Sequence, residues 1–137
     1  MIEDLEREGL IRPLSGGNER VKDTLALAHR DLDVAKKLLH SSNDWAFSVA
    51  YNAILQAGRA LMFSKGYRPA GSNQHISVVR FCEEFLRPDD ARWFERMRRK
   101  RHQAVYDSTG SVSDQEAENA VKKAEAILYM IESIIHE

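Results

Sequence analysis

Apolar residues return every three or four positions along most of the chain, which is the spacing of one buried face of an α-helix. The pattern is most regular over residues 18–40, where Asn18 can cap the helix, and over residues 113–136, where S-D-Q-E forms a capping box between Ser113 and Glu116. Shorter periodic segments, separated by Gly and Pro, predict further helices. The expected helices span approximately residues 1–9, 18–40, 45–65, 75–86, 90–106 and 113–136.

No segment alternates apolar and polar residues as a half-buried strand does, so the sequence predicts an all-α protein. Four of the expected helices are long, and short connections join successive helices. Short connections favour antiparallel neighbours. The predicted architecture is therefore an antiparallel up-and-down bundle of four or five helices.

The segment 45–65 differs from the other expected helices because it is apolar around most of its circumference. This composition predicts a central helix, buried on nearly all sides. One polar line interrupts it, formed by Ser48, Asn52, Gln56 and Arg59 at positions i, i+4, i+8 and i+11. The line either faces solvent or lines a cleft or subunit interface, where its polar groups need partners.

Composition narrows the possible functions without choosing one. The chain has 137 residues, of which 43% are hydrophobic and 30% charged, as expected for one globular domain. Its formal net charge is -1, so any binding of nucleic acid must rest on a local cationic surface. The only cysteine, Cys82, cannot form an internal disulfide, which favours a cytoplasmic protein.

Several kinds of site are not expected. The acidic N-terminus does not resemble a signal peptide, and the longest apolar stretch carries Asn52, Gln56 and Arg59, so we expect no membrane span. The five histidines are scattered, so we expect neither a metal site nor another cofactor. We interpret His75 as a helix-start residue after a Gly/Ser/Asn loop, and the acidic residues of R-D-L-D, at 30–33, as a solvated face.

One short stretch is strongly cationic. Residues 97–107 read M-R-R-K-R-H-Q-A-V-Y-D. Arg101 lies four residues after Met97 and four before Val105, so helical spacing places it on or beside the apolar face. A buried guanidinium without a partner is costly, so Arg101 should meet an acid, backbone carbonyls or a ligand anion. The other cations of this expected helix can instead form a solvated face near its C-terminus, where positive charge is favourable. They are Arg92, Arg96, Arg98, Arg99 and Lys100.

The segment R-H-Q-A-V-Y-D, on the penultimate long helix, resembles the signature of the HEPN family: an arginine, usually a polar residue, three variable positions and a histidine. Arg101 matches the arginine, His102 takes the polar position, and Tyr106 stands where the family has its histidine. The segments 30–39 and 44–69 and the C-terminal helix also resemble prokaryotic HEPN proteins.

This resemblance implies one HEPN-like helical domain over residues 1–137, with a short N-terminal helix and loop at 1–17. It also implies a homodimer in which the Arg–His motifs of two subunits face each other. Many members are metal-independent endoribonucleases, often toxins of toxin–antitoxin pairs. Others bind nucleotide, or partner a nucleotidyltransferase without cutting RNA.

The candidate site residues follow from this resemblance and from the charge pattern. Arginine binds phosphate through a fixed fork, and histidine exchanges protons near neutral pH. The candidates are Arg101, His102 and Tyr106 for catalysis, Arg98, Arg99 and Asp107 for phosphate or RNA, and Asn52, Gln56 and Arg59 for a cleft or interface.

Tyrosine, with a reference pKa of about 10, is a poor base at neutral pH. Three interpretations therefore stay open: a ribonuclease, a non-catalytic binding or assembly module, and a plain structural dimer whose arginines only solubilise it.

Overall fold

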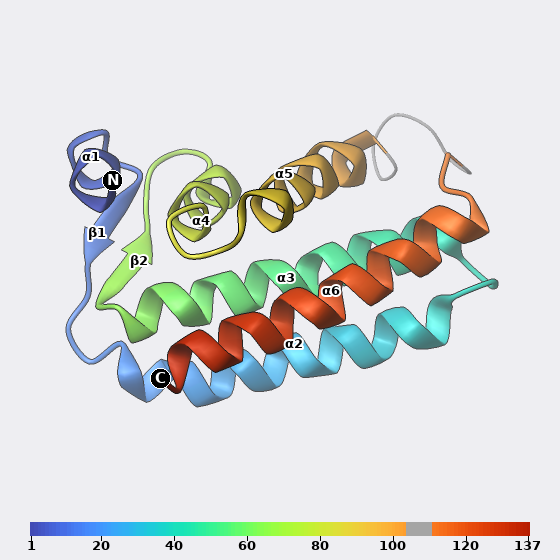
Figure 1. Ribbon diagram of the computed structural model, residues 1–137, viewed down its shortest axis with the longest axis horizontal. Helices are drawn as coiled ribbons and strands as arrows, with labels where there is room; N and C mark the ends of the chain where they lie inside the picture. The colour runs from blue at the N-terminus through green and yellow to red at the C-terminus, as the bar shows by residue number, and fades with distance from the viewer. Residues whose placement is uncertain (104–110) are drawn as a thin grey trace.

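The computed structural model describes residues 1–103 and 111–137. Two candidate residues, Tyr106 and Asp107, lie outside these ranges. The described residues form six helices and two short strands (Figure 1). In chain order they are α1 (Ile2–Arg7), β1 (Ile11–Pro13), α2 (Asn18–Leu38), α3 (Asn43–Ser64), β2 (Tyr67–Pro69), α4 (Gln74–Cys82), α5 (Pro88–His102) and α6 (Asp114–Ile135).

The predicted helical bundle is confirmed, with α3 at its centre. The long helices α2, α3 and α6 lie side by side, and α4 and α5 follow each other along another side of α3 (Figure 1). Fourteen of the 22 residues of α3 are buried, because small and apolar side chains surround most of its circumference. The helix therefore separates the α2–α6 side of the molecule from the α4–α5 side.

A short antiparallel strand pair was not predicted. β1 and β2 pair Ile11 with Pro69 and Pro13 with Tyr67, and Ile11 is fully buried. Each strand has only three residues and ends in proline, so the sequence contains no run long enough to show alternation. The pair ties the N-terminal segment to the connection between α3 and α4.

The N-terminal cap predicted from the sequence is confirmed for α6 but not for α2. The capping box of α6 is confirmed: the Glu116 backbone N–H donates to Ser113 Oγ (3.1 Å), and the Ser113 N–H donates to Glu116 Oε1 (3.2 Å). For α2 the cap is Gly17 rather than the predicted Asn18. A Cβ at position 17 would lie 2.3 Å from the Phe63 carbonyl oxygen, so only glycine fits this close approach to α3.

The α3–α4–α5 junction depends on another close approach. A Cβ at Gly58 would lie 2.6 Å from Val78 Cγ1 and 2.9 Å from Cys82 Sγ, both on α4. The fully buried ring of Phe94, on α5, lies next to the same point. Burial raises the pKa of Cys82 to about 12, so its thiol is a packing group rather than a nucleophile.

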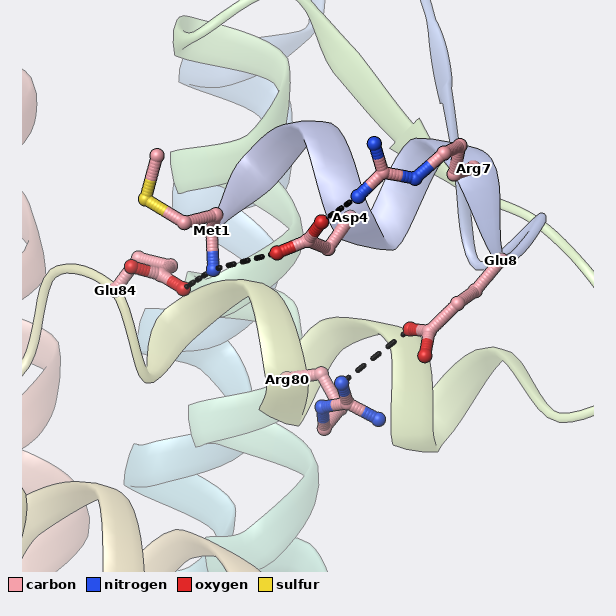
Figure 2. A network of polar contacts seen from close by, with 6 residues as sticks. All are labelled: Met1, Asp4, Arg7, Glu8, Arg80 and Glu84. Atoms are coloured by element: carbon pink, nitrogen blue, oxygen red, sulfur yellow. Dashed lines mark hydrogen bonds and ion pairs between the residues drawn. The ribbon is translucent and has the colours of Figure 1, made fainter.

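The short helix α1 packs against α4, and exposed ion pairs link the two (Figure 2). The Met1 amino group lies 2.5 Å from Glu84 Oε1, and Arg80 Nη2 lies 3.4 Å from Glu8 Oε2. Every one of these four side chains is at least about one-third exposed. Across the ranges described, each helix is too short or too polar to cross a bilayer.

Candidate functional site

A pocket of about 300 Å³ opens where the start of α4 meets the last turn of α5. We call it the Arg–His pocket. It is lined by Asn73, His75, Arg98, Arg101 and His102. The Asn73 side chain caps α4 by accepting a hydrogen bond from the Ile76 N–H (3.2 Å), which fixes the start of the helix and hence the position of His75.

Tyr51 of α3 fixes the ring of His75 by a hydrogen bond and by stacking. The Tyr51 hydroxyl lies 2.9 Å from His75 Nδ1, and the two rings stack with centroids 5.7 Å apart. Tyr51 is fully buried and also contacts the Phe94 ring. Burial raises the pKa of Tyr51 far above the neutral range, so the phenol keeps its proton.

The surroundings of His75 disfavour its charged form. Burial lowers the pKa of His75, and the positive charges of Arg101, Arg98 and Arg59 lower it further. The ring is therefore neutral at neutral pH. A half-buried histidine beside three guanidinium groups is an unusual electrostatic arrangement, and such perturbed groups are concentrated at functional sites.

Arg98 is fixed by a carboxylate. Its Nε and Nη2 donate to the two oxygens of Glu95 at 3.0 and 2.8 Å, and these hydrogen bonds hold the pKa of Glu95 below its usual value. Arg99 Nε also donates to Glu95, but the Arg99 side chain is exposed and does not line the pocket. Of the predicted phosphate-binding residues, the structure brings only Arg98 into the pocket, while Asp107 is not among the residues described.

The position of Arg101 agrees with the helical spacing. Arg101 is half-buried at the pocket, whereas Arg92, Arg96 and Arg99 are exposed on the outer face of α5. His102 also lines the pocket but is itself exposed, one residue further along the helix. The structure thus places two of the three predicted catalytic residues together.

The polar line of α3 is only partly internal. Ser48 is 6% exposed, so the line does not simply face solvent. Asn52 Nδ2 donates to Asp31 Oδ2 of α2 at 2.8 Å, while Gln56 and Arg59 are half-buried. Asn52, Gln56 and Arg59 do not line the Arg–His pocket. The positive charge of Arg59 nevertheless acts on His75, whose pKa it lowers.

The interpretation of R-D-L-D as a solvated face was wrong for Asp31, which is 6% exposed. The reason is the Asn52 hydrogen bond across the α2–α3 contact, joined by Arg30, whose guanidinium donates to the other Asp31 oxygen. Both carboxylate oxygens of Asp31 thus have hydrogen-bond donors, as a buried polar group requires.

A second hollow, of about 350 Å³, lies on another face of α5 beside Trp93 and Lys100. There the Lys100 amine already lies 3.7 Å from Glu116 Oε2 and donates to the Ser111 carbonyl oxygen at 3.2 Å. Lys100 is thus compensated, and Arg96, the other cation that lines this hollow, is exposed. The Arg–His pocket is the better candidate for an anionic ligand.

The pair of His75 and Tyr51 was not predicted from the sequence. His75 was interpreted as a helix-start residue, and Tyr51 as one apolar position among others. One signal was present: a tyrosine on a helix that is apolar nearly all round must find a partner for its hydroxyl. The sequence could not show that this partner would be a histidine 24 positions later.

Comparisons with known proteins address the fold. A family model described as the HEPN domain matches residues 21–134. A solved structure, the crystal structure of TT1696 from Thermus thermophilus, is similar with a TM-score of 0.68 and 19% sequence identity. The likeness covers 83% of this chain and 97% of that chain, and at this identity it shows the fold alone. Comparison with curated protein sequences gives no match.

Proposed function

Because this chain belongs to the HEPN domain family, we propose that the Arg–His pocket binds a phosphate group of RNA or of a nucleotide. The observation that carries the proposal is the convergence of Arg98, Arg101, His75 and His102 on one small pocket. Arginine offers phosphate a bidentate fork, and a pocket of one charge sign concentrates its field on the ligand.

The positive charges that act on the pocket support an anion. Those of Arg101, Arg98 and Arg59 all act on His75, and Glu95 holds Arg98 by a two-point hydrogen bond. A phosphate group entering there gains the attraction of guanidinium groups that are already held in place. Arg98 in particular loses little conformational freedom on binding, because Glu95 has fixed its side chain.

The reaction we propose is metal-independent cleavage of RNA by its own 2′-hydroxyl. The 2′-oxygen forms a bond to phosphorus while the bond from phosphorus to the 5′-oxygen of the next nucleotide breaks, which leaves a 2′,3′-cyclic phosphate. The proton removed from the 2′-hydroxyl is balanced by one delivered to the leaving 5′-oxygen, and the charge that builds up on the phosphorane needs stabilisation. Arg101 would hold the scissile phosphate, and His102 would carry the proton. Tyr106 lies four residues after His102 in the sequence, and we expect it to orient the substrate. A role as a toxin of a toxin–antitoxin pair belongs to the same proposal.

A comparison of two arginines tests the proposal. Arg101→Ala should weaken binding of a short single-stranded RNA about tenfold or more, because a charge-assisted fork is lost. The matched control is Arg99→Ala, which removes the same charge from an exposed side chain outside the pocket. Equal affinities of the two variants in a fluorescence-anisotropy titration would contradict phosphate binding in this pocket.

The wild type and Arg101→Ala also distinguish cleavage of RNA from binding of RNA without cleavage. In the presence of EDTA, the ribonuclease proposal expects RNA cleavage by the wild type and none by Arg101→Ala. Intact RNA, together with binding that depends on Arg101, would instead support a non-catalytic module that partners a nucleotidyltransferase or an antitoxin.

A second proposal concerns self-association. Leu27, Asp31 and Val34 share one face of α2 at i, i+4 and i+7, and Leu27 and Val34 are more than one-third exposed. Asp31 bonds Asn52, which lies on one face of α3 with the exposed Trp45, seven residues earlier. We propose that this α2–α3 surface is the interface of a homodimer, because it combines exposed apolar side chains with the polar line of α3.

A single substitution on α2 tests this interface. Val34→Arg should convert dimer to monomer in sedimentation experiments. Tyr129→Arg, at an exposed aromatic on α6, is the control and should leave the dimer intact. A monomeric wild type, or a dimer unaffected by Val34→Arg, would contradict this interface.

A further inference from the structure

We propose that His75 is a ligand-binding residue of the Arg–His pocket, donating from Nε2 to a phosphate oxygen, and that Tyr51 is its positioning residue. This inference rests on the proposed phosphate ligand and adds a residue that lies outside the Arg–His motif of α5. His75 comes from the start of α4, so two helices would hold the phosphate instead of one.

The direction of the Tyr51–His75 hydrogen bond follows from burial. The Tyr51 hydroxyl is fully buried and protonated, and His75 Nδ1 is the hydrogen-bond partner that the described residues give it. If Nδ1–H donated to Tyr51, the phenolic hydrogen would lack an acceptor among the residues that the structure describes, and such a loss costs about 1–3 kcal/mol. Tyr51 therefore donates, and Nδ1 accepts.

This direction fixes the tautomer of His75. A neutral imidazole whose Nδ1 accepts a hydrogen bond carries its proton on Nε2. Nε2 is the ring nitrogen that Tyr51 does not engage, on a residue that lines the pocket together with Arg98 and Arg101. The neutral ring thus offers an N–H donor without adding a further positive charge to those of the guanidinium groups.

The ring of His75 is fixed on two sides. Stacking on Tyr51 and the hydrogen bond at Nδ1 restrict both its position and its rotation. A donor held before the ligand arrives loses less conformational entropy on binding, so His75 suits the orientation of a phosphate.

A binding experiment with a non-cleavable probe tests the role of His75. The probe is a 2′-O-methyl RNA hexamer, which offers phosphodiesters but no nucleophilic hydroxyl. We expect His75→Leu to weaken binding about tenfold at neutral pH, because a hydrogen bond to a charged group is lost. His75→Gln should stay within about threefold of the wild type, because its side-chain amide can donate from nearly the same place. His136→Leu, at an exposed histidine, is the matched control.

Nitrogen-15 NMR of the histidine rings tests the role of Tyr51 without any ligand. The wild type should show His75 as the Nε2–H tautomer, and Tyr51→Phe should give a mixture of both tautomers and about threefold weaker binding of the hexamer. Tyr129→Phe, at an exposed tyrosine, should change neither result.

The outcomes separate this inference from the proposed function. If Arg101→Ala weakens binding but His75→Leu stays within about twofold of the wild type, the inference is overturned and the phosphate site stands. If neither variant weakens binding, both fail. An Nδ1–H tautomer in the wild type overturns the positioning role of Tyr51, even where His75→Leu binds poorly.

Discussion

The charged groups around the two ends of α4 are arranged differently. Near its C-terminal end, Arg80 faces Glu8 and the Met1 amino group faces Glu84, so each positive group has a negative one (Figure 2). At its N-terminal end, the neutral ring of His75 faces two guanidinium groups, those of Arg101 and of Arg98, which is itself paired with Glu95. One end consists of exposed ion pairs, and the other is a half-buried pocket where positive groups gather.

The difference distinguishes charges that attach α1 to α4 from charges that bind a ligand. Exposed ion pairs contribute little to stability, and those at the C-terminal end orient α1 on a helix that is already packed. At the N-terminal end, Arg98 is paired with Glu95, yet the positive charges of Arg101 and Arg98 still act on the neutral ring of His75, and an anion entering this space would be attracted by them. The comparison thus favours the N-terminal end of α4 as the functional one.

The largest effect is expected from a change that disturbs both ends together. Gly58→Ala should lower the free energy of unfolding by about 1–2 kcal/mol, since the new methyl group meets Val78 in the middle of α4 and Cys82 at its C-terminal end. The cost of overpacking exceeds the gain in helix propensity, which is about 1 kcal/mol. Urea denaturation measures the change. A midpoint equal to or above that of the wild type would show that α4 moves aside freely.

Gly58 also illustrates what the sequence could predict of the fold. The apolar circumference of residues 45–65 indicated a central helix, and the sequence predicted six helices near their observed bounds. The sequence did not indicate which helix approaches at which glycine, because that depends on contacts between α3 and α4. The β1–β2 pair was missed for a related reason: three-residue strands are stabilised by the partner strand rather than by their own pattern.

The candidate site was predictable only where one helix supplies it. Arg101 could be found from spacing within α5, since helical periodicity places it on or beside the apolar face, whereas Arg98 was a candidate only as one of the cations of the same helix. His75 and Tyr51 come from two other helices, and no local pattern links them. Asp31 was misjudged because its Asn52 partner lies 21 residues away.

The next largest effect is expected from placing a carboxylate in the positive pocket. Asn73→Asp keeps a side chain that caps α4 and adds a negative charge beside Arg98 and Arg101. Stability should rise by about 0.5–1 kcal/mol, while affinity for the RNA hexamer should fall about tenfold, because the new carboxylate competes with phosphate.

Gln74→Glu is the control for this substitution. It adds the same charge in the first turn of α4, at an exposed residue that does not line the pocket. It should stabilise the helix through the same dipole effect and should leave affinity nearly unchanged. Equal losses of affinity in the two variants would mean that general charge, rather than the pocket, binds the RNA.

A smaller effect should appear as a pH dependence of stability. The pKa of His75 is lowered in the folded protein, so the unfolded chain binds the proton first as the pH falls below about 6.5. Stability therefore declines on acidification from that pH down to the folded pKa. The charged or titratable groups that face His75 are Tyr51 and Arg59 on α3 and Arg98, Arg101 and His102 on α5.

His75→Gln isolates this contribution, because it removes the titrating ring and leaves the other groups in place. The free energy of unfolding of the variant should fall less steeply than that of the wild type between neutral and mildly acidic pH. Parallel curves would show that His75 titrates alike in both states. The depressed pKa of Glu95 acts at lower pH, below about 4.3, and remains in both proteins.

The smallest effect belongs to the C-terminal end of α4. Arg80→Ala should change the free energy of unfolding by no more than about 0.5 kcal/mol, because the 3.4 Å contact with Glu8 joins two side chains that are both about half-exposed. A double-mutant cycle with Glu8→Ala measures the coupling, and added salt should reduce it further. Affinity for the RNA hexamer should not change, since Arg80 is not among the residues that line the Arg–His pocket. If Arg80→Ala weakened binding as much as Asn73→Asp does, the two ends of α4 would act as one surface, and the distinction between attachment and binding would lose its functional meaning.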